Sequence, residues 1–138
     1  MIMVLVSIVL IAPLIAVVLC ATTRSARAAE SINLVAALIT VAAALPLPFM
    51  AHSARTALDG YLLVDALGTW VVLCAAVVYA LASIYSVGYM RLLNEPQRLM
   101  RFYALFAGFA WTTLAAPLMN NAGVYWIAVE MTTLVSTF

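Results

Sequence analysis

The sequence contains no lysine and little charge of any kind. Of its 138 residues only 8% are charged, with six arginines and five acidic residues, whereas 68% are hydrophobic. A soluble domain of this size needs roughly a quarter of its residues charged to cover its surface with polar groups. The composition therefore excludes an ordinary soluble domain, argues against a nucleic-acid-binding protein and indicates a membrane protein with the lipid bilayer as its surroundings.

Motifs for nucleotide, zinc and haem binding are also missing. The sequence has one histidine and no GxGxxG, Walker or HExxH pattern, so we expect no cofactor and no metal site. Its two cysteines, Cys20 and Cys74, lie in separate apolar runs without the CxxC spacing of a metal or redox pair. We interpret both as buried thiols, and a disulfide between them would require that their helices touch.

Five apolar runs are long enough, or nearly so, for helices that cross a membrane, since about 20 residues cross about 30 Å of hydrocarbon. We expect helices over residues 1–23, 31–51, 61–87, 102–119 and 122–138. Pro46 and Pro48 are expected to kink or end the second helix, and Pro96 is expected to mark a turn or the start of a short interfacial helix. The expected fold class is an all-α polytopic transmembrane bundle in one domain.

The first and the last apolar run can each be interpreted in two ways. The first run could be a secretory signal, but no positive residue precedes it and Leu19 gives a poor cleavage context, so we favour a membrane helix. The last run stops at Phe138 inside an apolar stretch without a polar tail. We expect a fragment truncated within its fifth helix, the alternative being a natural carboxyl terminus.

The arginines in the connections predict an orientation. The first connection has Arg24 and Arg27, the second has Arg55, and the third has Arg91, Arg98 and Arg101. The first and third connections share a side, and the positive-inside rule makes that side cytoplasmic, with the amino terminus outside. We expect a multi-pass protein of a bacterial inner membrane. The arginines of the third connection set this topology and contact lipid phosphates, or alternatively a cytoplasmic partner.

Glu130 is the most informative residue of the sequence. It lies eight residues into the fifth run, which is about 12 Å along a helix and close to the bilayer midplane. An acidic residue there costs about 2.5–3.5 kcal/mol on insertion scales, nearly as much as the apolar residues of the run return. We therefore expect Glu130 to face other helices or trapped water.

Small and polar side chains share the helix face of Glu130. Gly123, Trp126, Glu130, Thr133 and Thr137 recur at intervals of three and four residues, and the two threonine hydroxyls could hold water or bind the carboxyl group. We predict that Glu130 gains and loses a proton, with a cationic partner from outside this sequence, because every arginine lies in a loop or at a helix end. The alternative is a neutral structural acid that joins two helices.

Asp65 and His52 are further candidates. Asp65 lies four residues into the third run and heads a small, polar stripe that includes Gly68, Thr69, Ala76, Tyr79, Ser83 and Ser86. This shallow position favours a packing or capping role over proton transfer, although a supporting role in the proton path stays open. His52 stands beside Arg55 in a loop, where a solvated imidazole is the ordinary outcome and a site role is the alternative.

Three segments together resemble a known family of membrane proteins. They are residues 85–90 (YSVGYM), 101–106 (RFYALF) and 126–134 (WIAVEMTTL). The chain resembles the amino-terminal part of the antiporter-like subunits shared by complex I, Mrp-type cation/proton antiporters and membrane-bound nickel–iron hydrogenases. The likeness is greatest to the large membrane subunit of the hydrogenase-4 and formate hydrogenlyase group, and strongest from about Asp65 onward.

This resemblance implies a fourteen-helix fold with two inverted five-helix repeats and a line of charged residues at mid-membrane. It implies that Glu130 matches a fifth-helix glutamate that pairs with a lysine on the seventh helix. The chain would then be the amino-terminal portion of a non-redox, ion-translocating subunit, with other membrane subunits and a redox module as partners. The sequence departs from the family by ending before that lysine. The alternative is a small structural or assembly membrane protein without transport activity.

Overall fold

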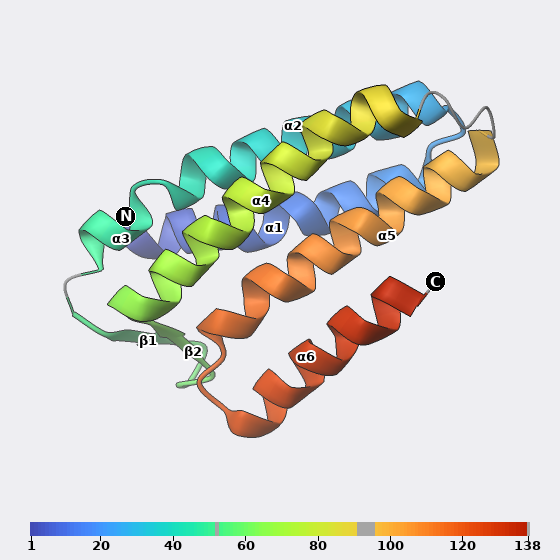
Figure 1. The fold of residues 1–138 in the computed structure, drawn as a ribbon. Coiled ribbons are helices and arrows are strands. Elements are labelled where there is room, and N and C mark those ends of the chain that lie inside the picture. Colours follow the sequence, from blue (N-terminus) through green and yellow to red (C-terminus); the bar gives the residue numbers. More distant parts are fainter. Residues whose placement is uncertain (52, 91–95, 138) are drawn as a thin grey trace.

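The computed structural model describes residues 1–51, 53–90 and 96–137, and most of them are helical (Figure 1). The elements in chain order are α1 (Ile2–Thr22), α2 (Ala26–Ala44), α3 (Leu47–Met50), β1 (Arg55–Ala57), β2 (Leu62–Val64), α4 (Ala66–Met90), α5 (Pro96–Ala115), the 3-10 turn η2 (Ala116–Leu118) and α6 (Ala122–Thr137). The expected helical bundle is confirmed, with one short hairpin added to it.

Among the residues that the structure describes, four helical segments are long and apolar enough to cross a membrane, namely Ile2–Thr22, Ala26–Met50, Ala66–Tyr89 and Leu99–Leu118. Large apolar side chains such as Ile15, Val35 and Leu81 are exposed on their outer faces, and hydrocarbon is the solvent that suits such faces. The chain is therefore a multi-pass membrane protein. Helix α6 has 16 residues and spans about 24 Å, which is less than the hydrocarbon core of about 30 Å.

Helix α2 begins at Ala26, earlier than the expected start at residue 31. Ser25 is extended and precedes an alanine-rich first turn, and alanine is the strongest helix former. This correction places Glu30 inside the helix. At the other end the prolines act as expected, because α2 stops before Pro46 and the short helix α3 carries Pro48 in its first turn.

The expected helix start at residue 61 is wrong, because the chain first forms a hairpin there. Strand β2 pairs antiparallel with β1, with Thr56 opposite Leu63. The turn between the strands has positive φ angles of 52°, 52° and 89° at Leu58, Asp59 and Gly60, a left-handed conformation that glycine and aspartate tolerate best. Helix α4 therefore begins only at Ala66.

Helix α5 also begins earlier than expected, at Pro96 instead of residue 102. Proline is favoured in a first helical turn because the missing N–H has no acceptor to lose there. The helix ends at Ala115, and Pro117 sits in the 3-10 turn η2 that follows.

The corner before α6 is tied to the hairpin. The backbone N–H of Asn120 donates to Tyr61 O at 2.8 Å, and its side-chain Nδ2 donates to Gly60 O at 2.8 Å. Asn121 then caps α6, because its Oδ1 accepts from the N–H of Gly123 at 2.9 Å. These contacts fix where α6 leaves the bundle.

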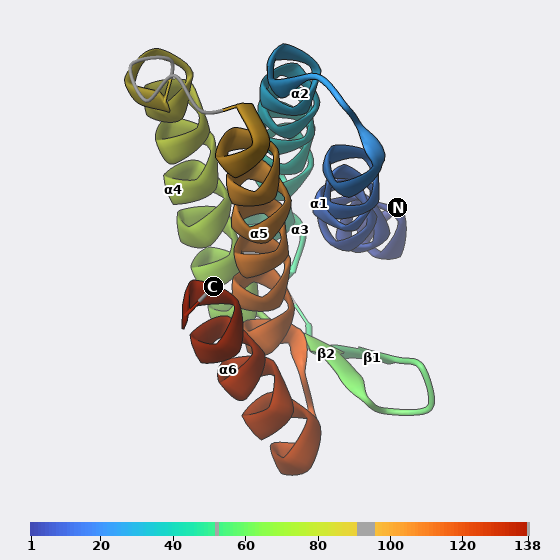
Figure 2. The same ribbon diagram turned by 90° about the vertical axis from the view of Figure 1, so that its right-hand side faces the viewer.

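Helices α1, α2, α4 and α5 form the bundle, and α6 lies against the outside of α5 (Figures 1 and 2). The connection from α1 to α2 and the start of α5 lie at one end of the bundle, and the hairpin, α3 and η2 lie at the other (Figure 1). The main core lies at the hairpin end, where Leu47, Val64, Val72, Leu114 and Leu118 are fully buried. Farther from it, buried alanines such as Ala37 and Ala107 let the helices approach closely.

Candidate functional site

Glu130 lies on the side of α6 that faces away from α5. The partly buried residues of α6 are Val124, Ala128, Thr132 and Val135, and no residue of this helix is fully buried. Successive side chains of an α-helix are rotated by about 100° about the helix axis. Glu130 follows Ala128 by two residues, so its side chain is rotated by about 200° from that of Ala128 and points to nearly the opposite side. Helix α6 contacts α5 and η2 and no other described element. The face that carries Glu130 is therefore covered by nothing else in the described chain.

The stripe expected around Glu130 is present as one exposed face. Gly123, Trp126, Glu130, Thr133 and Thr137 are all exposed. A shallow hollow of about 430 Å³ runs along this face, lined by Trp126, Ile127, Glu130, Met131, Thr133, Leu134 and Thr137. It is an open surface feature made by one helix, so a second element would be needed to close it.

Within the described part of the chain, Thr133 is the polar side chain that lies near the carboxyl group of Glu130. Thr133 Oγ1 lies 3.5 Å from Glu130 Oε2, but the same hydroxyl donates a shorter bond of 2.7 Å to the Glu130 backbone oxygen. Thr137 donates to Thr133 O at 2.8 Å instead of to the carboxyl group. Of the arginines whose side chains the structure describes, which are Arg24, Arg27, Arg55 and Arg101, none forms an ion pair with Glu130.

Asp65 caps helix α4, which is the role favoured from the sequence. Its Oδ1 accepts from the N–H of Gly68 at 2.7 Å, and its backbone oxygen accepts from Thr69 Oγ1 at 2.9 Å. A Cβ at Gly68 would lie 2.7 Å from Asp65 Oδ1 and 2.9 Å from Pro117 O, so the start of α4 packs directly on η2. The structure does not bring Asp65 and Glu130 together, because α4 and α6 make no contact.

The small, polar stripe of α4 faces the protein interior, as expected. Gly68, Thr69, Ala76, Tyr79, Ser83 and Ser86 are all buried. Tyr79 Oη donates to Asn33 Oδ1 at 2.8 Å, and Asn33 Nδ2 donates to Ser83 Oγ at 3.0 Å. These two bonds join α2 to α4 inside the bundle.

Sequence reasoning missed Glu30 because it placed the start of α2 too late, and it did not single out Asn33, which lies inside the expected helix. Glu30 is only 8% exposed, and Asn33 and Thr40 on the same helix are fully buried. Their spacing of three and seven residues is that of one helix face. This periodicity would have identified a buried polar face, had the helix been extended to Ala26.

The prediction of two buried cysteines was correct for one of them, and other predictions concern residues that the structure does not describe. Cys20 is buried as expected, whereas Cys74 is exposed on the outer face of α4, and both thiols are free. His52, Arg91, Glu95 and Phe138 lie outside the described residues.

Comparison of the chain with protein-family models, curated proteins and solved structures finds no match.

Proposed function

We propose that this chain is the amino-terminal portion of a proton-translocating membrane subunit, in which Glu130 belongs to the proton path. The observation that carries the proposal is the placement of Glu130 on the face of α6 that no other described element contacts. A carboxyl group that served only to join helices of this chain would lie between α5 and α6. Glu130 points the other way.

The energetics of α6 support a partner on that face. An acidic residue at the centre of a membrane helix costs about 2.5–3.5 kcal/mol, while each Ile, Leu or Val returns about 0.3–0.6 kcal/mol. Helix α6 has only Val124, Ile127, Val129, Leu134 and Val135 of these types. The sum of these insertion free energies is close to zero, so transfer of α6 from water into lipid is hardly favourable by itself. A second helix or trapped water on the Glu130 face would remove the penalty.

The partner would carry the missing positive charge. The chain has no lysine, and Arg24, Arg27, Arg55 and Arg101 lie near the bundle ends. In the proposed mechanism, Glu130 forms an ion pair with a cation of a neighbouring helix and exchanges it for a proton. Proton uptake at Glu130 is thereby coupled to charge movement in the neighbouring helix.

The resemblance to antiporter-like subunits supplies the wider setting of this proposal. The subunit would sit in a bacterial inner membrane with its amino terminus outside, beside other membrane subunits and a redox module of hydrogenase or NADH–quinone oxidoreductase type. The coupling ion would be H⁺, with Na⁺ as the alternative ion. The rival function, a small structural or assembly protein, predicts no effect of Glu130 on ion movement.

The substitution Glu130→Gln tests the proposal in the assembled complex in its membrane. It keeps the size and polarity of the side chain and removes the titratable proton, so proton translocation is expected to fall at least about tenfold, measured with a pH-sensitive dye in inverted vesicles. Assembly should be unchanged.

The matched control is Asp59→Asn, which removes another carboxylate from the exposed hairpin turn. This variant should translocate protons like the wild type. Normal translocation by Glu130→Gln would remove Glu130 from the mechanism and favour the structural role.

A further inference from the structure

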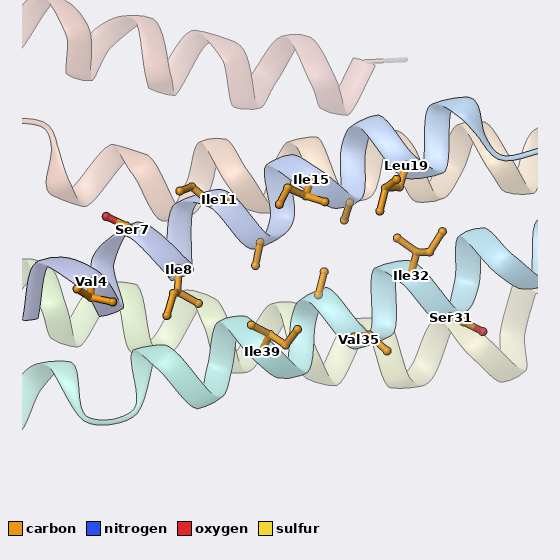
Figure 3. Close-up of a pocket in the computed structure, with 13 residues that line it drawn as sticks. Val4, Ser7, Ile8, Ile11, Ile15, Leu19, Ser31, Ile32, Val35 and Ile39 are labelled. Atoms are coloured by element: carbon orange, nitrogen blue, oxygen red, sulfur yellow. The ribbon is translucent and has the colours of Figure 1, made fainter. Parts of the chain in front are cut away.

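An apolar groove runs along the outer seam between α1 and α2 (Figure 3), at a distance in sequence from every residue of the proposed proton site. Its volume is about 610 Å³. The ridges are formed by Ile11, Ile15, Val35 and Ile39, which are exposed, and the floor by the buried Ala16 and Ala36. Small residues between rows of β-branched side chains create the depth of the groove.

The groove has the length of a lipid tail. On α1 it extends from Val4 to Leu19, which corresponds to about 22 Å of helix. One leaflet of the hydrocarbon core is about 15 Å deep, half of the whole. An acyl chain that descends from a headgroup at the Leu19 end therefore stays inside the groove down to the bilayer midplane.

Positive charge lies at that same end of the groove. Arg27 is one helical turn before Ser31, and Ser31, Val35 and Ile39 line the groove at four-residue spacing, so Arg27 continues their row. Arg24 lies in the connection just before α2. Both arginines are exposed, and neither forms an ion pair with any carboxylate of the described residues.

The amino end of α2 adds a second feature that suits an anion. Its N-cap residue, Ser25, makes no side-chain capping bond, so the first-turn N–H groups of this 19-residue helix stay available. A helix amino terminus with open N–H groups attracts phosphate. Arg24, Arg27 and this helix end lie together at the mouth of the groove.

We propose that the α1–α2 groove binds an anionic phospholipid, with one acyl chain along the groove and its phosphate at Arg24, Arg27 and the amino end of α2. The apolar groove suits the acyl chain of such a lipid, and the arginines at its end suit the phosphate. A partner helix could pack into the apolar groove without needing the arginines. The site is independent of Glu130 and of proton transport.

Native mass spectrometry tests this site on the chain released from nanodiscs that contain equal amounts of phosphatidylglycerol and phosphatidylcholine. The wild type is expected to retain phosphatidylglycerol on the order of tenfold more often than phosphatidylcholine, since each arginine near the surface favours the anionic lipid severalfold. The double variant Arg24→Gln/Arg27→Gln should lose this preference. The variant Ala12→Phe, which fills the groove at a half-exposed lining residue, should retain less of both lipids.

The matched control is Arg55→Gln, which removes an exposed arginine at the other end of the bundle and should behave like the wild type. Equal retention of the two lipids by the wild type would overturn the proposal, as would an unchanged preference in the double variant. A dimer that disappears in Ala12→Phe would assign the groove to a second copy of the chain and would also overturn it. Circular dichroism on each variant checks that the helices form, and the two exposed arginines decide the test if Ala12→Phe does not fold.

Discussion

At the scale of single residues, short polar contacts lie at two points within the apolar bundle. Asp65 caps α4 by accepting a hydrogen bond from the N–H of Gly68, and the carbonyl oxygen of Pro117 lies close to the same glycine. Deeper in the bundle, Asn33 joins Tyr79 and Ser83. In a membrane these hydrogen bonds contribute to the stability of the folded chain, because lipid offers no competing partner for a buried polar group.

Gly68→Ala is expected to destabilise the chain. The new Cβ would lie 2.7 Å from Asp65 Oδ1 and 2.9 Å from Pro117 O, so it disturbs the cap and pushes α4 away from η2. We expect a loss of about 1–3 kcal/mol, the usual range for overpacking, measured by unfolding in mixed detergent micelles. Gly88→Ala in the same helix is the control, because a Cβ there meets no atom within 4 Å. Equal stability of the two variants would show that the close approach at Gly68 is not present.

Tyr79→Phe is expected to weaken the contact between α2 and α4. It removes the hydroxyl that donates to Asn33 Oδ1 at 2.8 Å, and interhelical hydrogen bonds in membranes contribute about 0.6 to 1.7 kcal/mol. The same unfolding measurement should show a loss in that range. Tyr85→Phe, on the exposed side of α4, should change the free energy of unfolding by only a few tenths of a kcal/mol. A Tyr79→Phe variant as stable as the wild type would argue against the buried network.

At the scale of elements, the existence of the helices could be predicted, whereas their ends could be predicted only in part. Pro46 marked the end of α2, but α2, α4 and α5 begin at other residues than expected. Long apolar runs identify membrane helices because backbone groups in hydrocarbon must bond within the segment. The ends depend on local chemistry instead: Pro96 opens α5 and Asp65 caps α4. Strands β1 and β2 have three residues each, too few for an alternating pattern to stand out in the sequence.

The candidate site could also be predicted only in part. Helical spacing was sufficient to place Trp126, Glu130 and Thr133 on one face of α6, because that spacing is a property of the helix alone. Whether that face is covered depends on which other helices pack against it, and no local pattern contains this information. Glu30 was missed for a related reason, since its burial depends on where α2 begins.

Helix α6 should insert poorly when the chain is produced alone. Its apolar residues nearly balance the cost of Glu130, so removing that cost shifts the balance by about 3 kcal/mol. With a glycosylation acceptor placed after residue 137, Glu130→Leu is expected to change insertion of α6 from partial to nearly complete. Thr132→Leu adds the same apolar side chain without removing an acid and should have a smaller effect. Complete insertion of the wild-type helix would contradict the view that Glu130 needs a partner.

At the scale of the whole molecule, charge is distributed unevenly between the two ends of the bundle. Arg24, Arg27 and Arg101 lie at the end with the α1–α2 connection, and Arg55 lies at the hairpin end (Figure 1). Positive residues favour the cytoplasmic side. The hairpin and the amino terminus should therefore face the outside.

Cysteine labelling in intact cells tests this orientation. In a chain with Cys20→Ala and Cys74→Ala, an impermeant maleimide should label Ser53→Cys, next to the hairpin, without permeabilisation. Ser25→Cys, in the α1–α2 connection, should react only after the membrane is opened; both serines are exposed. The reverse labelling pattern would contradict the expected orientation.

In the proposed function, Glu130 changes its protonation state inside the membrane. Infrared difference spectra of the assembled complex, recorded between low and high pH, test it most directly, because a protonated carboxyl group has its own C=O stretching band. We expect a carboxyl band that is present at low pH and absent at high pH in the wild type, and that is missing in Glu130→Gln. Identical difference spectra for the two proteins would contradict it.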